Sequence, residues 1–286
     1  AGLYVTVGNY HENYAKILSQ LYSLTSDPEN LRKAIKIYQG AIEAYDKVDW
    51  HSYVAEINWR IATIQNKMGK YLEAAQSFQT ASEKYRVAAD KTVPLKDFYL
   101  SYASYMQAWS IIEKAKHSHI REDYSQSKVY YEKAADLCKA LKLWSYLAPN
   151  YLAWAYLEHG EDLSRKEKSE EAIQAFKHAI KLFSETKESL EAATLKIESS
   201  DEKEKALALG KASEARQEYC QGRILLEEAR IHDRESNMSL SAEKYSLATK
   251  VFQRVAEALE EESERKELYL MIYFCQAWEK MKLAEQ

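Results

Sequence analysis

The chain has 286 residues, of which 46% are hydrophobic and 29% are charged, and its formal net charge is −4 at pH 7. A slightly acidic chain lacks the basic surface that nucleic-acid backbones attract, and no segment approaches the roughly 18 consecutive apolar residues of a membrane-spanning helix. With only 7 Gly and 3 Pro, far below average usage, the composition predicts an all-α protein with no nucleic-acid partner and no direct membrane insertion.

Along the chain, one helical stripe recurs: a small residue, an aromatic residue four positions later, and a small residue after three more. Offsets of four and seven place side chains on one face of an α-helix. The small residues let a neighbouring helix approach closely, and the ring fills the space beside them. The stripe occurs at Ala34-Tyr38-Ala41, Ala74-Phe78-Ala81, Ser127-Tyr131-Ala134, Ala172-Phe176-Ala179 and Ala248-Phe252-Val255.

The clearest pair of helices lies at about 55–85. An amphipathic segment over 56–64 is followed by Gly69, a residue suited to the left-handed end of a helix. Two helices joined by so short a turn lie antiparallel. The order and spacing of this pair resemble the tetratricopeptide repeat, and the matching residues are Ile61-Ala62, Gly69-x-Tyr71, Ala74, Phe78 and Ala81.

The resemblance covers about two-thirds of the chain and implies a right-handed superhelix of antiparallel helix pairs, here with about 11–12 helices. The family period is about 34 residues, whereas the stripes here are 40, 53, 45 and 76 residues apart. We expect the extra length in the first helices and the turns, as in the SNAP-like subset with long helices. The expected small reference residues of the first helices are Ala62, Ala108, Ala155 and Gly222.

The 76-residue interval predicts an extra helix near 185–198 and a long helix from about 202 to 234, with a capping box at Ser199-x-x-Glu202. We therefore expect one array over 1–198, with about four pairs and the extra helix. A further pair and a terminal helix over 199–286 would continue it. The terminal helix is apolar on nearly every face, whereas an array should end on a polar face. A partner, a homodimer through 268–283 or a longer natural chain would cover it.

Catalytic and metal-binding motifs are missing from the sequence. There is no Gly-rich phosphate loop, no His-Glu-x-x-His and no paired Cys spacing. His117-x-His119 is the one metal candidate, but it lies at an expected helix end, where cationic side chains are common. Cys138, Cys220 and Cys275 are widely spaced, which favours buried thiols in a reducing, cytoplasmic setting. We predict no catalysis, no cofactor and no metal.

In the family, residues at fixed offsets from the reference residue of each first helix face a concave groove. The resemblance therefore implies a groove of rings and a few charges, which suits an extended or helical peptide. Alternatively, these rings belong to the core, because Tyr and Trp often bury the ring and leave a polar tip in water. The candidate partner-binding residues are Trp59, Asn66, Lys67, Tyr102, Tyr105, Trp109, Tyr156, His159, Arg216, Tyr219 and Arg223.

The expected function is a non-catalytic scaffold or adaptor that binds a protein or peptide segment in this groove. A chaperone-type carboxylate clamp is not expected, since Trp59 and Tyr105 stand where the family's clamp places Lys or Asn. Two alternatives remain open from the sequence. One is a sensory or regulatory module of a larger signalling protein that holds a small peptide or metabolite. The other is an enzyme or metal protein.

Overall fold

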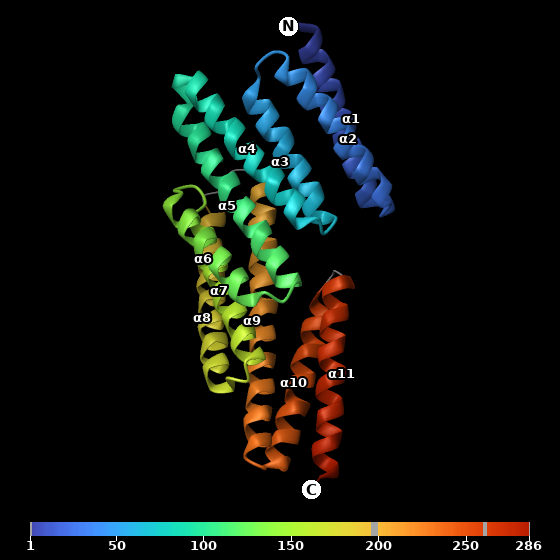
Figure 1. Cartoon of the computed structure of the whole chain (residues 1–286), viewed down its shortest axis with the longest axis vertical. Helices are drawn as coiled ribbons and strands as arrows, with labels where there is room; N and C mark the ends of the chain where they lie inside the picture. The colour runs from blue at the N-terminus through green and yellow to red at the C-terminus, as the bar shows by residue number, and fades with distance from the viewer. Residues whose placement is uncertain (1, 196–199, 260–261, 286) are drawn as a thin grey trace. The chain divides into compact units, whose positions relative to one another are not determined.

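A computed structural model describes residues 2–195, 200–259 and 262–285. Over these ranges the regular structure consists of eleven α-helices and two short 3₁₀ segments, without a strand (Figure 1). The helices form two compact units, which we treat separately: residues 1–121 with 140–142, and residues 122–139 with 143–286. No helix within the described ranges is long and apolar enough to span a membrane.

In the first unit, each helix packs against the next one in the chain (Figure 1). One core cluster joins the first three helices around Tyr45, and a second joins the last three around Phe78. The elements are α1 (Gly2–Thr25), α2 (Pro28–Asp46), α3 (His51–Lys67), α4 (Tyr71–Lys91), the 3₁₀ segment Val93–Leu95, and α5 (Lys96–Ile120).

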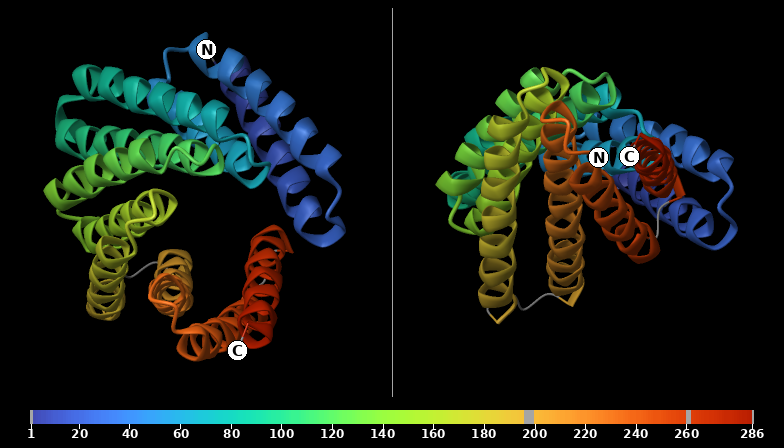
Figure 2. Two further views of the ribbon diagram at one scale, coloured as in Figure 1. Left: turned by 60° about the horizontal axis from the view of Figure 1, so that its bottom comes forward. Right: turned by 90° about the horizontal axis from the view of Figure 1, so that it is seen from below.

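In the second unit, α7 to α11 likewise pack in chain order, and α9 lies between α8 and α10 (Figure 2). Tyr131 of α6 stacks on Tyr151 and Trp154 of α7. The elements are α6 (Tyr124–Ala140), the 3₁₀ segment Ser145–Leu147, α7 (Ala148–Arg165), α8 (Ser169–Thr194), α9 (Ser200–Arg234), α10 (Met238–Ala258) and α11 (Glu262–Ala284).

Four pairs of consecutive helices are joined by the same three-residue turn, at 68–70, 121–123, 166–168 and 235–237. In three of them the N–H of the last turn residue donates to a carbonyl five residues back, as from Lys70 to Gln65 at 2.9 Å. This bond is typical of the Schellman motif. The middle residue of every turn has a positive φ; these residues are Gly69, Glu122, Glu167 and Ser236.

Counted from this left-handed residue, the small residues fall at constant positions. Seven residues before it stand Ala62, Ala115, Gly160 and Ala229, and five residues after it stand Ala74, Ser127, Ala172 and Ser241. All eight are buried. A Cβ on Gly160 would lie 2.5 Å from the ring of Phe176, which explains why that site holds glycine. Each pair thus keeps a spacing of 12, as between Ala62 and Ala74.

Two expectations from the sequence are therefore wrong. The turns carry no extra length, because the true reference residues are Ala115, Gly160 and Ala229 rather than Ala108, Ala155 and Gly222. The extra length lies in the helices. There is also no separate helix over residues 185–194, since α8 continues through Thr194. The expected boundary at 198/199 and the capping residue Ser199 lie outside the described residues.

Candidate functional site

The first unit carries a row of half-buried rings on α3 and α5. Trp59 lies 6.2 Å from Tyr102 and 6.1 Å from Tyr105, between ring centroids, and Tyr105 lies 6.1 Å from Trp109. All four pack against the core cluster that contains Phe78. Each ring therefore contacts the core and keeps part of its surface in solvent, and its part in binding a partner stays a prediction.

Phe98 extends this row and was missed in the sequence. Its ring centroid lies 4.7 Å from that of Tyr102, and 51% of the residue is exposed. The signal was available, because Phe98 stands four residues before Tyr102 and therefore on the same helical face. We call Trp59, Phe98, Tyr102, Tyr105 and Trp109 the ring surface.

Asn66 joins α3 to α5 through a buried carboxylate. Its Nδ2 donates to Oε1 of Glu113 at 2.5 Å, and Nζ of Lys116 donates to the same oxygen at 2.8 Å. Glu113 is fully buried, and Lys116 also lies 5.9 Å from the ring of Trp109. A buried carboxylate is tolerated when it is paired and hydrogen-bonded, so Asn66 serves this helix junction.

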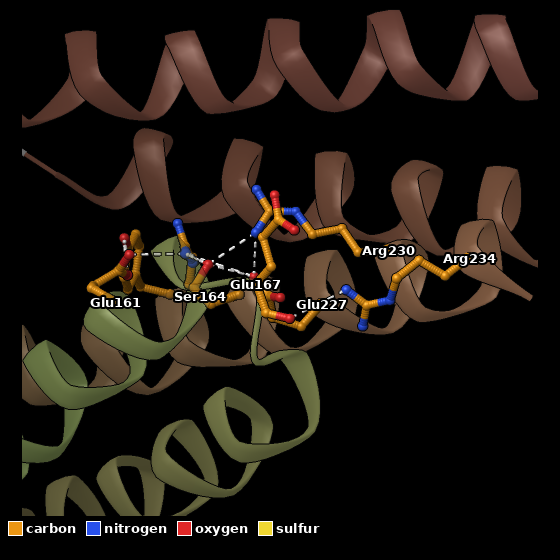
Figure 3. Close-up of polar contacts among 8 residues, drawn as sticks. Glu161, Ser164, Glu167, Glu227, Arg230 and Arg234 are labelled. Atoms are coloured by element: carbon orange, nitrogen blue, oxygen red, sulfur yellow. Dashed lines mark hydrogen bonds and ion pairs between the residues drawn. The ribbon is translucent and has the colours of Figure 1, made fainter.

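In the second unit, a polar network joins α7 to α9 (Figure 3). The hydroxyl of Ser164 donates to Glu227 at 2.6 Å and accepts from Arg223 at 2.8 Å and from Arg230 at 3.0 Å. Arg230 also donates to Glu227 at 2.7 Å. The carboxylate of Glu227 is fully buried, and it is compensated by cations on its own helix.

A second carboxylate, Glu161, completes this network. It forms an ion pair with Arg223 at 2.8 Å and accepts from the hydroxyl of Tyr219 at 2.9 Å. Burial alone would lower the pKa of Arg223, but the carboxylate of Glu161 and other nearby groups raise it above its ordinary value. Burial and Glu161 together raise the pKa of Tyr219. We call Glu161, Ser164, Tyr219, Arg223, Glu227 and Arg230 the ionic network.

The geometry of the ionic network fits a structural role better than a chemical one. The Ser164 hydroxyl donates to Glu227, and its oxygen accepts from both Arg223 and Arg230, so both of its lone pairs are occupied and neither is directed at a substrate. A general base needs a lone pair directed at a substrate proton, whereas the Glu161 oxygens face Arg223 and Tyr219. The network therefore fixes α7 against α9.

The two junctions use the same positions relative to the small reference residue. On α3 and α7 the donor, Asn66 or Ser164, stands four residues after the small reference residue of that helix. On α5 and α9 the carboxylate, Glu113 or Glu227, stands two residues before the reference residue of that helix. The cation follows one residue after the reference. A charged residue occupies the position two before the reference on all four helices, and this pattern could have been found in the sequence: Arg60, Glu113, Glu158 and Glu227.

Four of the predicted partner-binding residues lie apart from the ring surface, the Asn66 junction and the ionic network. Lys67 is exposed at the end of α3. Tyr156 stacks on His178 at 5.2 Å, and the guanidinium of Arg216 lies 4.6 Å from the ring of Trp154. Burial, and to a smaller extent the positive charge of Lys128, lowers the pKa of the half-buried His159. The structure thus separates the predicted groove set into distinct local environments.

Among the described residues, no three His, Cys, Asp or Glu side chains are grouped to hold a metal ion. His117 and His119 are both half-buried on α5. No family model matches the chain, and no curated protein matches it in sequence.

Proposed function

We propose that this chain is a tetratricopeptide-like helical-repeat scaffold that binds a segment of another protein and carries out no catalysis. The observation that carries the proposal is the ring surface. Four of its five rings are half-buried and the fifth, Phe98, is mostly exposed. The constant spacing of 12 between buried small residues in four helix pairs supports the repeat assignment.

The chemistry of the ring surface indicates the kind of segment that it binds. Trp and Tyr are the residues that most often dominate binding energy in protein interfaces. Their rings are already held by packing on the core, so little side-chain entropy is lost on binding. The carboxylate of Glu113, on the same helix as Trp109, is neutralised by Lys116. The ring surface therefore favours a peptide segment with apolar or aromatic side chains at helical or extended spacing.

The test is affinity capture from native lysate, followed by titration of the captured protein in purified form. Phe98→Ala removes the most exposed ring of the surface, and a Trp59→Ala/Tyr105→Ala pair removes its centre. We expect the pair to weaken binding by about 30-fold or more, since a central anchor contributes about 2 kcal/mol or more.

The matched control is Tyr273→Ala, which removes a 63% exposed ring on α11. Circular dichroism and urea unfolding of each variant confirm that the fold is retained, because the removed rings also touch the core. Binding unchanged by both Phe98→Ala and the pair, in variants that remain folded, would exclude the ring surface as the binding site.

A further inference from the structure

Helix α1 exposes a continuous apolar stripe on the side that faces away from α2. Its exposed large side chains alternate at spacings of four and three residues without a break over the helix. Their exposed fractions range from 37% for Val7 to 84% for Leu24. We call this set the α1 stripe: Leu3, Val7, Tyr10, Tyr14, Ile17, Leu21 and Leu24.

The spacing of the α1 stripe points to a helix as its partner. A repeat of four and three residues has a mean period of 3.5, which keeps the seam facing a second helix in a coiled coil. The opposite side of α1 is already occupied, since Gly8, Ala15 and Leu18 are buried and Ala15 and Leu18 belong to the core cluster of the first three helices. A Cβ on Gly8 would lie 2.5 Å from the ring of Tyr45. Both sides of α1 are thus built for packing.

The α1 stripe is also free of charge. None of the seven residues of the stripe is charged, and Gly2–Thr25, all of which the structure describes, contains only two Lys, Arg, Asp or Glu residues, Glu12 and Lys16, of which the Lys16 side chain is 37% exposed. Glu12 and Lys16 form an ion pair with each other at 2.6 Å, and the Glu12 side chain is only 12% exposed. In the whole chain 29% of residues are charged. Depletion of charge together with enrichment of tyrosine is the composition of an interface core.

This composition indicates which kind of partner covers the α1 stripe. A charged helix facing the stripe would bury charges without a counter-charge, which is costly. Lys16 is the only Lys or Arg of α1 and is paired with Glu12, which argues against an anionic membrane surface as the partner. An uncharged stripe is compatible with itself, since two copies bring no like charges together. We propose that α1 pairs with α1 of a second copy, so that the protein is a homodimer held by a two-helix coiled coil.

The size of the α1 stripe is sufficient for such a dimer. A helix of 24 residues is about 36 Å long. Seven large side chains on each copy would remove on the order of 1,500 Å² from solvent, which is the size of a standard stable interface. The exposed side of α11 fits this role less well. Its apolar residues, such as Leu270 and Tyr273, share that side with the exposed Lys280 and Glu267.

The experiment measures molar mass by light scattering and the dissociation constant by sedimentation equilibrium. We expect the wild-type chain at twice its 33.2 kDa monomer mass. Tyr10→Glu with Ile17→Glu places two carboxylates in the seam and should weaken the dimer by at least about 100-fold. The matched control is Leu270→Glu with Tyr273→Glu on α11, which should leave the dimer intact.

A second measurement does not depend on destabilising the chain. Tyr14 is the middle residue of the α1 stripe, so it faces its own copy in a parallel or an antiparallel pair. Because the three native cysteines are buried, oxidation of a Tyr14→Cys variant should give a covalent dimer, whereas Leu270→Cys should not. A monomer at about 100 µM, or dissociation by the α11 variant instead of the α1 variant, would overturn the proposal.

Discussion

The α3–α5 junction and the α7–α9 junction share one design with different chemistry. In both, a polar residue of the first helix (α3 or α7) donates to a buried glutamate of the second (α5 or α9), and a cation on the glutamate's own helix also binds it. The neighbouring positions differ. Six residues before the small reference residue, α5 has the ring of Trp109 and α9 has the guanidinium of Arg223; the reference residues are Ala115 and Ala229.

The difference between the ring of Trp109 and the guanidinium of Arg223 is accompanied by a second difference, on α3 and α7. The residue after the small reference residue is Thr63 on α3, after Ala62, and Glu161 on α7, after Gly160. Glu161 forms the ion pair with Arg223. A buried cation thus appears together with its carboxylate, because an unpaired buried charge is costly. The first unit keeps the partly exposed ring of Trp109 at one of these positions, whereas the second uses both positions to fix its own helices.

Removing the buried guanidinium should have the largest effect. Arg223→Ala leaves Glu161 without its cation, and we expect the second unit to lose about 3–5 kcal/mol of stability. All three cysteines lie in this unit and are buried, so the rate of thiol labelling in urea measures its opening specifically. Burial raises the pKa of the Cys138 thiol to about 12 and that of Cys275 to about 11, which suppresses labelling of the folded state.

The control for this prediction is a Glu161→Gln/Arg223→Met pair, which removes both charges together. It should be less destabilised than Arg223→Ala, because replacing a buried ion pair with neutral groups costs less than breaking it. Equal destabilisation of the two variants would show that the ionic network contributes through packing rather than through charge.

The effects of neutralising Glu227 and Glu113, the glutamates of the two junctions, should follow the number of cations that each one binds. Glu227→Gln weakens contacts to Arg230 and Ser164 and the longer 3.9 Å contact to Arg223, and we expect a loss of about 2–3 kcal/mol. Glu113→Gln affects one cation and Asn66, with a loss of about 1–2 kcal/mol. Urea unfolding of both variants checks the order, and a larger loss for Glu113→Gln would contradict the comparison.

Substitutions in two of the turns should change the stability by smaller amounts and in opposite directions. Gly69 has φ +71, and a Cβ added there would meet only open space, so Gly69→Ala should cost about 1 kcal/mol through backbone conformation alone. Glu167 adopts the same conformation with φ 58, so Glu167→Gly should stabilise the second unit by up to about 1 kcal/mol. Thermal unfolding measures both. Destabilisation by Glu167→Gly would mean that its side chain matters more than its φ.

The last effect is absent at neutral pH and should appear only at alkaline pH. Burial raises the pKa of Tyr124 and of Tyr245, both in the second unit, from 10.0 to about 12. Their stabilising contribution is complete below pH 10 and falls as the pH rises toward 12, because the unfolded phenols ionise first. Tyr245→Phe should therefore flatten the decline of stability between these pH values. Tyrosinate absorbance during a pH titration would disprove this if both phenols ionised near pH 10 in the folded state.

The sequence by itself determined the local features of this protein. Helical periodicity depends on residues within about two turns of each other, so the all-α class, the pair at 55–85 and the face shared by Tyr102, Tyr105 and Trp109 could all be found from spacing. The α1 stripe was equally visible as a period, but whether it is exposed depends on what α1 packs against.

The tertiary structure alone decided the register of the helix pairs and the partners of the buried charges. Glu122, Glu167 and Ser236 adopt the left-handed conformation that glycine usually occupies. Three of the four turns therefore contain no glycine to mark them in the sequence, and the small reference residues of their first helices were predicted at the wrong positions. Ser164 and Glu227 are 63 residues apart in the chain. Their contact depends on how α7 lies against α9, and that arrangement is set by packing over whole helices rather than by any local pattern.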